Sequence, residues 1–293
     1  MYFANCHNHS TFSDGTYTPE RLVELAAQVG HKAVILTDHD TVRGTYFLQK
    51  AARKAGLLSL LGCEFSTVSP EGKNVHLLGF DFNPDNKKMQ ELLAYTSSRQ
   101  TVRSHLLFDF GLERGTLREG ITWQEVLDDH PYNDYFCNNQ VFVSLVKRGI
   151  YQELEYFDFF RASFGVSYNP AAKAKLKEKL NMPEPAMTDV IEIIKAAGGA
   201  PVVAHPHGYG EFAESWVRLG VRGFETIHPD LDADDMAFFD KFCNEHDLYK
   251  MGGTDHSSVL GGLTDTMPHH RLPASSGYTT EEHFMKLYRR ELG

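Results

Sequence analysis

The chain has 293 residues, of which 42% are hydrophobic and 12% aromatic, so its composition supports a packed core and excludes a largely disordered chain. Its formal net charge of −10 argues against a broad basic surface for DNA or RNA. The four cysteines are widely spaced, and no apolar run approaches the roughly 18 residues that a membrane span needs. We therefore expect free thiols, no membrane span, no signal peptide and a cytoplasmic location.

Short apolar runs alternate with amphipathic segments in the first part of the chain. Residues 2–5 are a predicted strand, and a helix is predicted over 19–29. Thr18 is its expected N-cap, Pro19 stands at its first position and Gly30 follows its end. Further strands are predicted over 32–36, 57–62 and 74–80, with a helix over 46–55.

The same alternation returns after residue 188. Helices are predicted over 188–199, 211–220 and 233–246, and strands over 200–204, 222–227 and 248–253. Alternation of this kind indicates an α/β fold with a mainly parallel sheet, either a barrel or an open doubly wound sheet. Residues 88–187 instead suggest helices and loops. We interpret them as a mostly helical insertion, a lid or satellite domain between two barrel halves at 1–87 and 188–293.

Residues that can bind metals stand at or just after nearly every predicted strand. Strand ends at one edge of a parallel sheet are where active sites are built. Histidines and carboxylates that meet at such an edge have the composition of a multinuclear Zn, Mn or Fe site. The role of His228, which follows the strand 222–227, stays open. The other residues placed in this way are His7, His9, Asp14, His39, Glu64, His76, His205, His207, Asp255 and His256.

Each cluster alone has an ordinary explanation. A lone histidine is usually on the surface or satisfied in the core, and "TDHD" could be a turn with aspartate caps. The joint placement is harder to explain in that way, because surface histidines have no preference for strand ends. Other chemistries find little support, since the chain has no GxxxxGK[ST], HExxH or GxSxG motif.

The motifs "CHNHSTFSDGTYTP", "AVILTDHDTVRG", "GCEFS", "VHLLGF", "GAPVVAHP" and "GGTDHS" together resemble the PHP family, the polymerase and histidinol phosphatase domains. The helical insertion resembles the stand-alone metal-dependent phosphoesterase branch. This resemblance implies a distorted (β/α)7 barrel, two or three divalent metals (Mn, Zn or Fe) and hydrolysis of phosphate esters. It makes Glu64 the expected bridging carboxylate and implies the metal ligands His7, His9, Asp14, His39, Glu64, His76, His205 and Asp255.

Three positions depart from the family pattern. The usual Asp-x-His motif is replaced by Asp255 followed directly by His256, and Ser257 holds the usual histidine position. The Gly-Arg-Pro-His motif of the branch is absent, because "CNNQ" ends at Gln140. Gly208 replaces the usual arginine after the His-Pro dipeptide. Phosphate recognition therefore differs from that of better-known members.

We therefore expect a metal-dependent phosphoesterase that acts on a small phosphorylated metabolite or nucleotide through a metal-activated hydroxide. Glu64 and His256 are the expected catalytic residues, and Arg103 and His207 the expected contacts to a small anionic substrate. No nucleic-acid polymer is expected as a partner. Two alternatives stay open. One is a hydrolase of a cyclic phosphate, a phosphodiester or a C–N bond, and the other is a non-catalytic, metal-stabilised interaction module.

Overall fold

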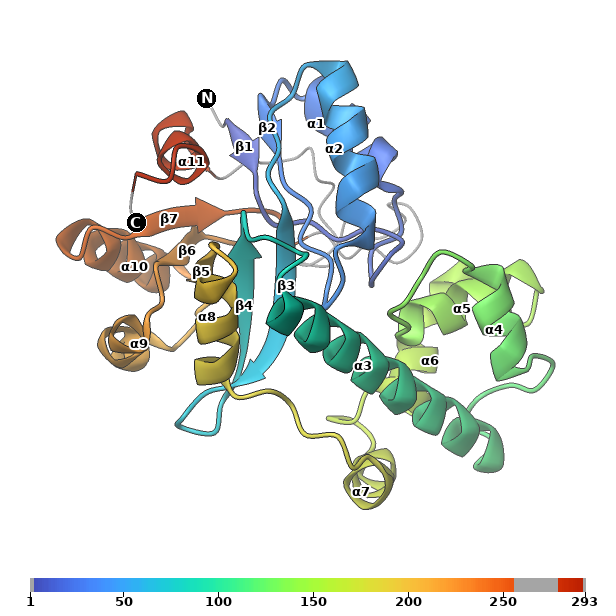
Figure 1. The fold of residues 1–293 in the computed structure, drawn as a ribbon. Coiled ribbons are helices and arrows are strands. Elements are labelled where there is room, and N and C mark those ends of the chain that lie inside the picture. Colours follow the sequence, from blue (N-terminus) through green and yellow to red (C-terminus); the bar gives the residue numbers. More distant parts are fainter. Residues whose placement is uncertain (1–2, 256–278, 292–293) are drawn as a thin grey trace.

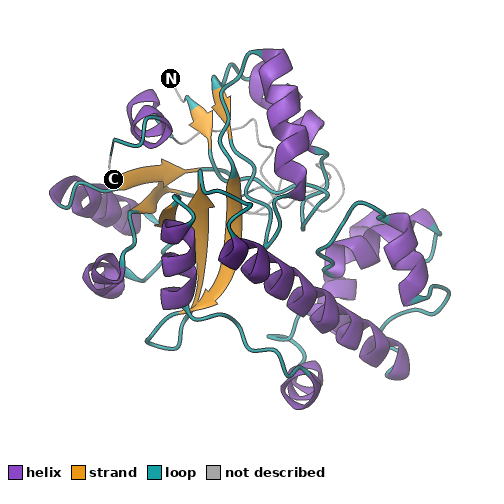
Figure 2. Cartoon of the chain, in the orientation of Figure 1, coloured by secondary structure: helices purple, strands orange, loops and turns teal. Residues whose placement is uncertain are grey.

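The computed structural model describes residues 3–255 and 279–291 and has a mixed α/β fold, as predicted (Figures 1 and 2). Its strands are β1 (Ala4–Asn5), β2 (Ala33–Val34), β3 (Gly62–Val68), β4 (Asn74–Phe80), β5 (Ala200–Val203), β6 (Gly223–Ile227) and β7 (Tyr249–Gly252). Its α-helices are α1 (Pro19–Gln28), α2 (Arg43–Ala55), α3 (Lys87–Glu113), α4 (Trp123–Asp129), α5 (Asn138–Lys147), α6 (Tyr156–Phe159), α7 (Pro170–Lys179), α8 (Met187–Ala196), α9 (Ala213–Leu219), α10 (Ala233–Glu245) and α11 (Glu281–Tyr288).

The described strands form two sheets. β1 and β2 pair in parallel, and β3 to β7 form a five-stranded sheet in chain order. β5, β6 and β7 are parallel, whereas β4 is antiparallel to both β3 and β5. The prediction of a mainly parallel sheet is therefore wrong for β4. Residues 69–73 are the reason, because a five-residue connection can close a hairpin but cannot carry the crossover that a parallel neighbour needs.

Backbone contacts connect the small sheet to both edge strands of the large sheet, β3 and β7. His39, which follows β2, forms a parallel bridge with Glu64 of β3. On the other side, the Cys6 amide donates to the Gly252 carbonyl at 3.2 Å, and the Asp255 amide donates to the His7 carbonyl at 2.9 Å. The segments that follow β1, β2 and β7 therefore meet near β3.

The first helix forms as its sequence predicts, but the strand predicted over 57–62 has different bounds in the structure. Thr18 accepts a hydrogen bond from the Arg21 amide, and Pro19 opens α1. The strand predicted over 57–62 instead begins at Gly62, so Glu64 lies inside β3 and not beyond its end. Leu58, within the predicted strand, forms only an isolated parallel bridge with Ala33 of β2, so the apolar run alone does not fix where the longer strand starts.

The middle of the chain has its own apolar cluster. α3 leaves the edge of the sheet and runs toward α4, α5 and α6, as Figure 1 shows. The fully buried residues of this cluster include Phe108, Phe142, Phe159 and Phe164. A separate cluster around Trp216 and Phe224 joins α8, α9 and α10 to the sheet.

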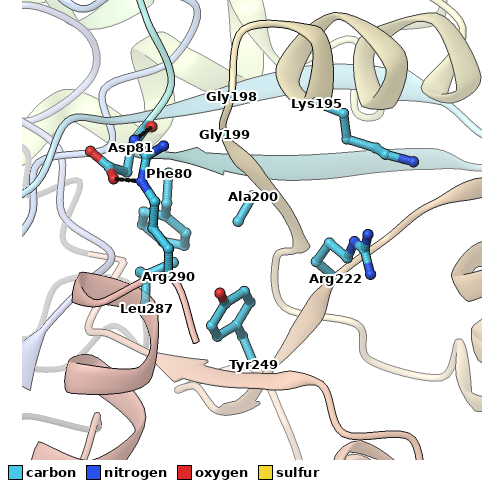
Figure 3. A pocket seen from close by; sticks show the side chains of 10 residues that line it. All are labelled: Phe80, Asp81, Lys195, Gly198, Gly199, Ala200, Arg222, Tyr249, Leu287 and Arg290. Carbon is cyan, nitrogen blue, oxygen red and sulfur yellow. Dashed lines mark hydrogen bonds and ion pairs between the residues drawn. The ribbon is translucent and has the colours of Figure 1, made fainter. Parts of the chain in front are cut away.

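One hollow of the fold lacks the clustered histidines expected of the site. A hollow of about 290 Å³ lies where β5 and β7 begin, and Figure 3 shows Asp81 paired with Arg290 at its edge. Among the described residues, the one carboxylate that lines this hollow is held in that ion pair, and no histidine lines it. In the part of the chain that the structure describes, no helix combines the length and apolarity of a membrane span.

Candidate metal centre

Imidazoles and carboxylates from distant parts of the sequence converge beside the ends of β1 and β7. The Glu64 carboxylate lies 3.1 Å from Nε2 of His7 and 3.1 Å from Nε2 of His9. Asp255 Oδ1 lies 2.9 Å from the same nitrogen of His9. One donor atom from each of these residues lies within 4.8 Å of the others, which suits a single metal ion.

Two neighbouring groups share residues with this one. His9 Nδ1 lies 3.3 Å from Asp14, whose other oxygen lies 3.9 Å from His39. Glu64 Oε1 lies 2.9 Å from His76 and 3.1 Å from His205. The structure thus brings together every residue of the expected ligand set: His7, His9, Asp14, His39, Glu64, His76, His205 and Asp255.

Glu64 is the centre of this cluster. Its carboxylate is 1% exposed, and burial alone would raise its pKa. The nearby imidazoles of His39, His7 and His76 outweigh burial and hold the pKa of Glu64 well below its usual value. Glu64 therefore stays ionised, with both oxygens facing ring nitrogens, which is the arrangement that a bridging carboxylate requires.

The histidines of the cluster fit a metal centre. Nδ1 of His39 and Nε2 of His228 are buried and have no hydrogen-bond partner among the described residues. Buried polar atoms are rarely left unpaired, and such nitrogens are the donors that transition metals select. Burial lowers the pKa of His39 to about 4, whereas nearby carboxylates outweigh burial and raise the pKa values of His7 and His9 well above the usual value.

Two buried residues behind the ligands were not assigned from the sequence. Both oxygens of Glu225, on β6, lie 3.1 Å from Nδ1 of His7, and its Oε2 accepts a hydrogen bond from the His205 amide at 2.8 Å. His228, which the sequence left open, lies 3.4 Å from Asp255 Oδ2. A glutamate inside the apolar run "GFETI" is the signal that could have revealed Glu225, because a charged residue is rarely buried without a partner.

The backbone at the cluster is strained. His205 and Asp255 have φ values of 30° and 47°, which side chains other than glycine rarely adopt. Gly253 is required for a different reason, because a Cβ there would lie 2.3 Å from the His7 amide nitrogen. Strain of this kind persists where surrounding contacts enforce it, and it concentrates at functional sites.

Arg103 and His207, the residues expected to contact substrate, lie in different surroundings, and Arg103 is described first. Arg103 is half-buried on α3 and makes no ion pair within the described residues. Burial lowers the pKa of Arg103, and Tyr135 makes the largest contribution in the opposite direction. The Tyr135 ring in turn stacks on His39, with centroids 6.3 Å apart. Tyr135 is therefore beside a proposed ligand, and it also acts electrostatically on Arg103.

His207 does not join the central cluster. Its side chain is 61% exposed, and Nδ1 lies 2.5 Å from Asp235 at the start of α10. Arg99 is also engaged elsewhere, because it pairs with Glu184 at 3.0 Å. His256 and Ser257 lie outside the described residues, so their roles stay predictions.

A family match follows the same residues. The family model of the PHP domain matches residues 5–144, which include His7, His9, Asp14, Glu64 and His76. The resemblance to the PHP family is thereby confirmed for this part of the chain. Glu225 and Asp255 lie beyond the matched residues, so their place in the site rests on the geometry alone.

Similar proteins agree with the predicted class of enzyme. A 5'-3' exoribonuclease from Haemophilus influenzae is 27% identical over 88% of this chain and 90% of the relative. A phosphoribosyl 1,2-cyclic phosphate 1,2-diphosphodiesterase from Eggerthella lenta is 25% identical over 92% of this chain and 98% of the relative. A solved structure assigned as a metal-dependent phosphoesterase, from Bifidobacterium adolescentis, is similar with a TM-score of 0.76 at 27% identity, covering 99% of this chain and 96% of that chain. The predicted metal-dependent phosphoric ester hydrolase is confirmed as a class.

One prediction about partners is wrong. The net charge of −10 led to the expectation that no nucleic-acid polymer is a partner. Relatives named as 5'-3' exoribonucleases contradict it, including those of Haemophilus influenzae and Escherichia coli. Net charge describes the whole surface, whereas an enzyme that acts at a chain end needs positive charge at only a few phosphates. Bound metal ions can supply that charge within an acidic protein.

Proposed function

We propose that this PHP protein is a metal-dependent phosphodiesterase that cleaves the ends of short RNA chains. The choice of a diester rests on three amide residues of the insertion, near Asp14. Where the phosphoesterase branch has a cationic Arg-Pro-His sequence, this chain has the neutral amides Asn138, Asn139 and Gln140. A diester carries less negative charge at its phosphate than a monoester, so it needs fewer cations. The relative from Haemophilus influenzae, named as an exoribonuclease, supports RNA as the substrate.

Two or three divalent metals, Mn, Zn or Fe, would be held by overlapping groups of residues. The first position would use His7, His9, Glu64 and Asp255. The second would use His39, Glu64 and His76, with His205 close to Glu64. The third would use His9, Asp14 and His39. Bound metals of this kind supply positive charge to phosphoryl oxygens and lower the pKa of water. In this proposal Glu64 joins the positions, because its two oxygens face different histidines.

The chain's other residues would orient the ligands and the substrate. Glu225 accepts a hydrogen bond from His7 Nδ1, which leaves Nε2 as the free nitrogen facing Glu64 and Asp255. Arg103 and Tyr135 would line the side of the site formed by the insertion. His256 remains our candidate for the group that protonates the leaving oxygen.

The architecture proposed for this function is a distorted (β/α)7 barrel. The contacts from His39 to Glu64 and from Cys6 to Gly252 support it, because they connect both edges of the small sheet to the large one. Residues 1–87 and 188–293 would form this barrel, and 88–187 the insertion that covers the substrate. Four buried free cysteines support a reducing, cytoplasmic setting.

Replacing Arg103 with alanine should lower kcat/KM by about 10- to 100-fold while the metal content stays unchanged. Arg103 makes no ion pair within the described residues, so its guanidinium is available to phosphate, and the proposed charge-assisted hydrogen bond would be lost. Steady-state kinetics and metal analysis of Arg103→Ala measure both effects. Arg114→Ala, at the exposed end of the same helix, is the matched control and should behave as wild type. Unchanged kinetics in Arg103→Ala would exclude a substrate contact.

The substrate is tested by comparing phosphate linkages under one set of conditions. Metal-reconstituted protein is incubated with a short 5'-phosphorylated RNA, a ribose cyclic phosphate, a nucleoside bisphosphate and a simple phosphomonoester. The proposal expects released mononucleotides from RNA and the highest kcat/KM on a diester. A ribose cyclic phosphate as the preferred substrate would favour the second candidate, which the relative from Eggerthella lenta suggests. A preference for monoesters would contradict the choice of a diester.

A further inference from the structure

We propose that Asn139 and Gln140 of the insertion are positioning residues that hold the Asp14 loop in the conformation that binds metal. The proposal rests on the proposed metal centre and adds a role for residues that ligate nothing. These amides come from the first turn of α5, more than a hundred residues after the loop that they contact.

The amides donate directly to the backbone of the ligand loop. Asn139 Nδ2 donates to the Asp14 carbonyl, and Gln140 Nε2 donates to the Ser13 carbonyl. Both side chains are buried, at 4% and 2% exposure. A buried carbonyl that loses its hydrogen-bond donor is destabilised, so the loop conformation depends on these contacts.

Cys137 Sγ also contacts the Ser13 carbonyl, at 3.8 Å, whereas other anchors of the loop act at different atoms. Ser13 Oγ donates to Asp38 at 2.6 Å, and the Ser10 amide donates to the same carboxylate at 2.6 Å. These contacts hold the beginning of the loop. The peptide unit of Asp14 itself is held from the insertion, while the Asp14 side chain is 27% exposed and points to His9 and His39.

Neighbouring residues of the insertion contact the same side of the site. Asn133 donates to the Thr11 carbonyl at 2.8 Å. Asp134 accepts from the Thr41 hydroxyl at 2.8 Å and from Arg43 at 2.7 Å. The segments after β1 and after β2, which carry Asp14 and His39, are thus both docked on the insertion.

Two nearly isosteric substitutions separate this role from the folding of α5. Gln140 also caps the helix, because its Oε1 accepts from the Cys137 amide at 2.9 Å. Gln140→Glu keeps that acceptor and removes the donor to Ser13. Asn139→Asp keeps the oxygen that accepts from the Tyr156 hydroxyl at 2.9 Å and removes the donor to Asp14. Gln140→Met is a neutral variant of similar length that tests whether an added charge explains the result.

The experiment is a Mn²⁺ titration of chelator-treated protein, read by electron paramagnetic resonance and by bound metal per chain. We expect the most weakly bound Mn²⁺ ion to dissociate about 10-fold more readily from the variants than from wild type, the scale seen when residues that orient metal ligands are replaced. This applies to the Asn139→Asp, Gln140→Glu double variant and to Gln140→Met. In chelator both variants should remain folded at the titration temperature, with an unfolding midpoint below that of wild type because buried carbonyls lose their donors. Gln124→Glu, on exposed α4, carries a matched charge and should titrate as wild type.

The outcomes separate this proposal from the proposed function. Variants that titrate as wild type, with or without a loss of stability in chelator, would overturn the positioning role while leaving the metal centre intact. Weaker Mn²⁺ binding in the double variant but not in Gln140→Met would also overturn it, because added charge would then be the cause. Wild-type protein that binds no Mn²⁺ would overturn the proposed function itself.

Discussion

Glu64→Gln should abolish turnover, with a loss of at least about 10³-fold in kcat, and should reduce the bound metal by one ion or more per chain. Glu64 is a buried carboxylate whose oxygens face ring nitrogens on two sides. An amide of the same shape offers one neutral oxygen and one nitrogen that cannot act as a ligand. The change therefore removes the charge that would bridge two cations without opening a cavity.

The measurements are kcat on the best substrate, metal per chain and far-UV circular dichroism. Glu192→Gln, an exposed carboxylate on α8, is the control for the chemical change and should keep full activity. Glu64→Asp keeps the charge on a shorter side chain and should retain more metal than Glu64→Gln. Wild-type activity with full metal content in Glu64→Gln would show that Glu64 bridges nothing.

Glu225→Gln should weaken metal binding by about 10- to 100-fold, although Glu225 is not among the proposed ligands. Its carboxylate lies behind His7 and is fully buried. Burial by itself lowers the pKa of His7, but Glu225, Glu64 and Asp255 together raise it well above the usual value. Losing the Glu225 charge would reduce the basicity of His7 and free its ring to turn.

This effect is measured as the concentration of Zn²⁺ or Mn²⁺ that restores half of the bound metal in chelator-treated protein. Glu71→Gln is the matched control, because Glu71 also accepts a side-chain hydrogen bond, from the Trp216 indole, but lies away from the cluster. Equal affinities in Glu225→Gln and wild type would mean that the His7–Glu225 pair serves folding alone.

Strand ends made much of the site predictable from the sequence. His7 and His9 follow β1, His39 follows β2, and Asp255 follows β7, so they meet at one place once the strands align. Glu64 and His76 were found although they lie inside β3 and β4. They face the site because the hairpin runs past it, which the apolar pattern did not reveal.

Other parts of the site depend on contacts that no local pattern encodes. Glu225 is a single charged residue in a short apolar strand, and only its distance to His7 reveals its role. The docking of Asn139 and Gln140 joins segments far apart in the chain. His207 also follows a strand, but its exposed ring pairs with Asp235 and not with the central cluster, so its contact to substrate stays a prediction.

The central claim is that the clustered histidines and carboxylates form a metal centre. Elemental analysis of the purified protein tests it most directly, together with activity before and after dialysis against a chelator. We expect two or three divalent transition-metal ions per chain, loss of activity with their removal and recovery on adding Mn²⁺, Zn²⁺ or Fe²⁺. Protein without metal, with a phosphoesterase activity that is indifferent to chelator, would contradict the account.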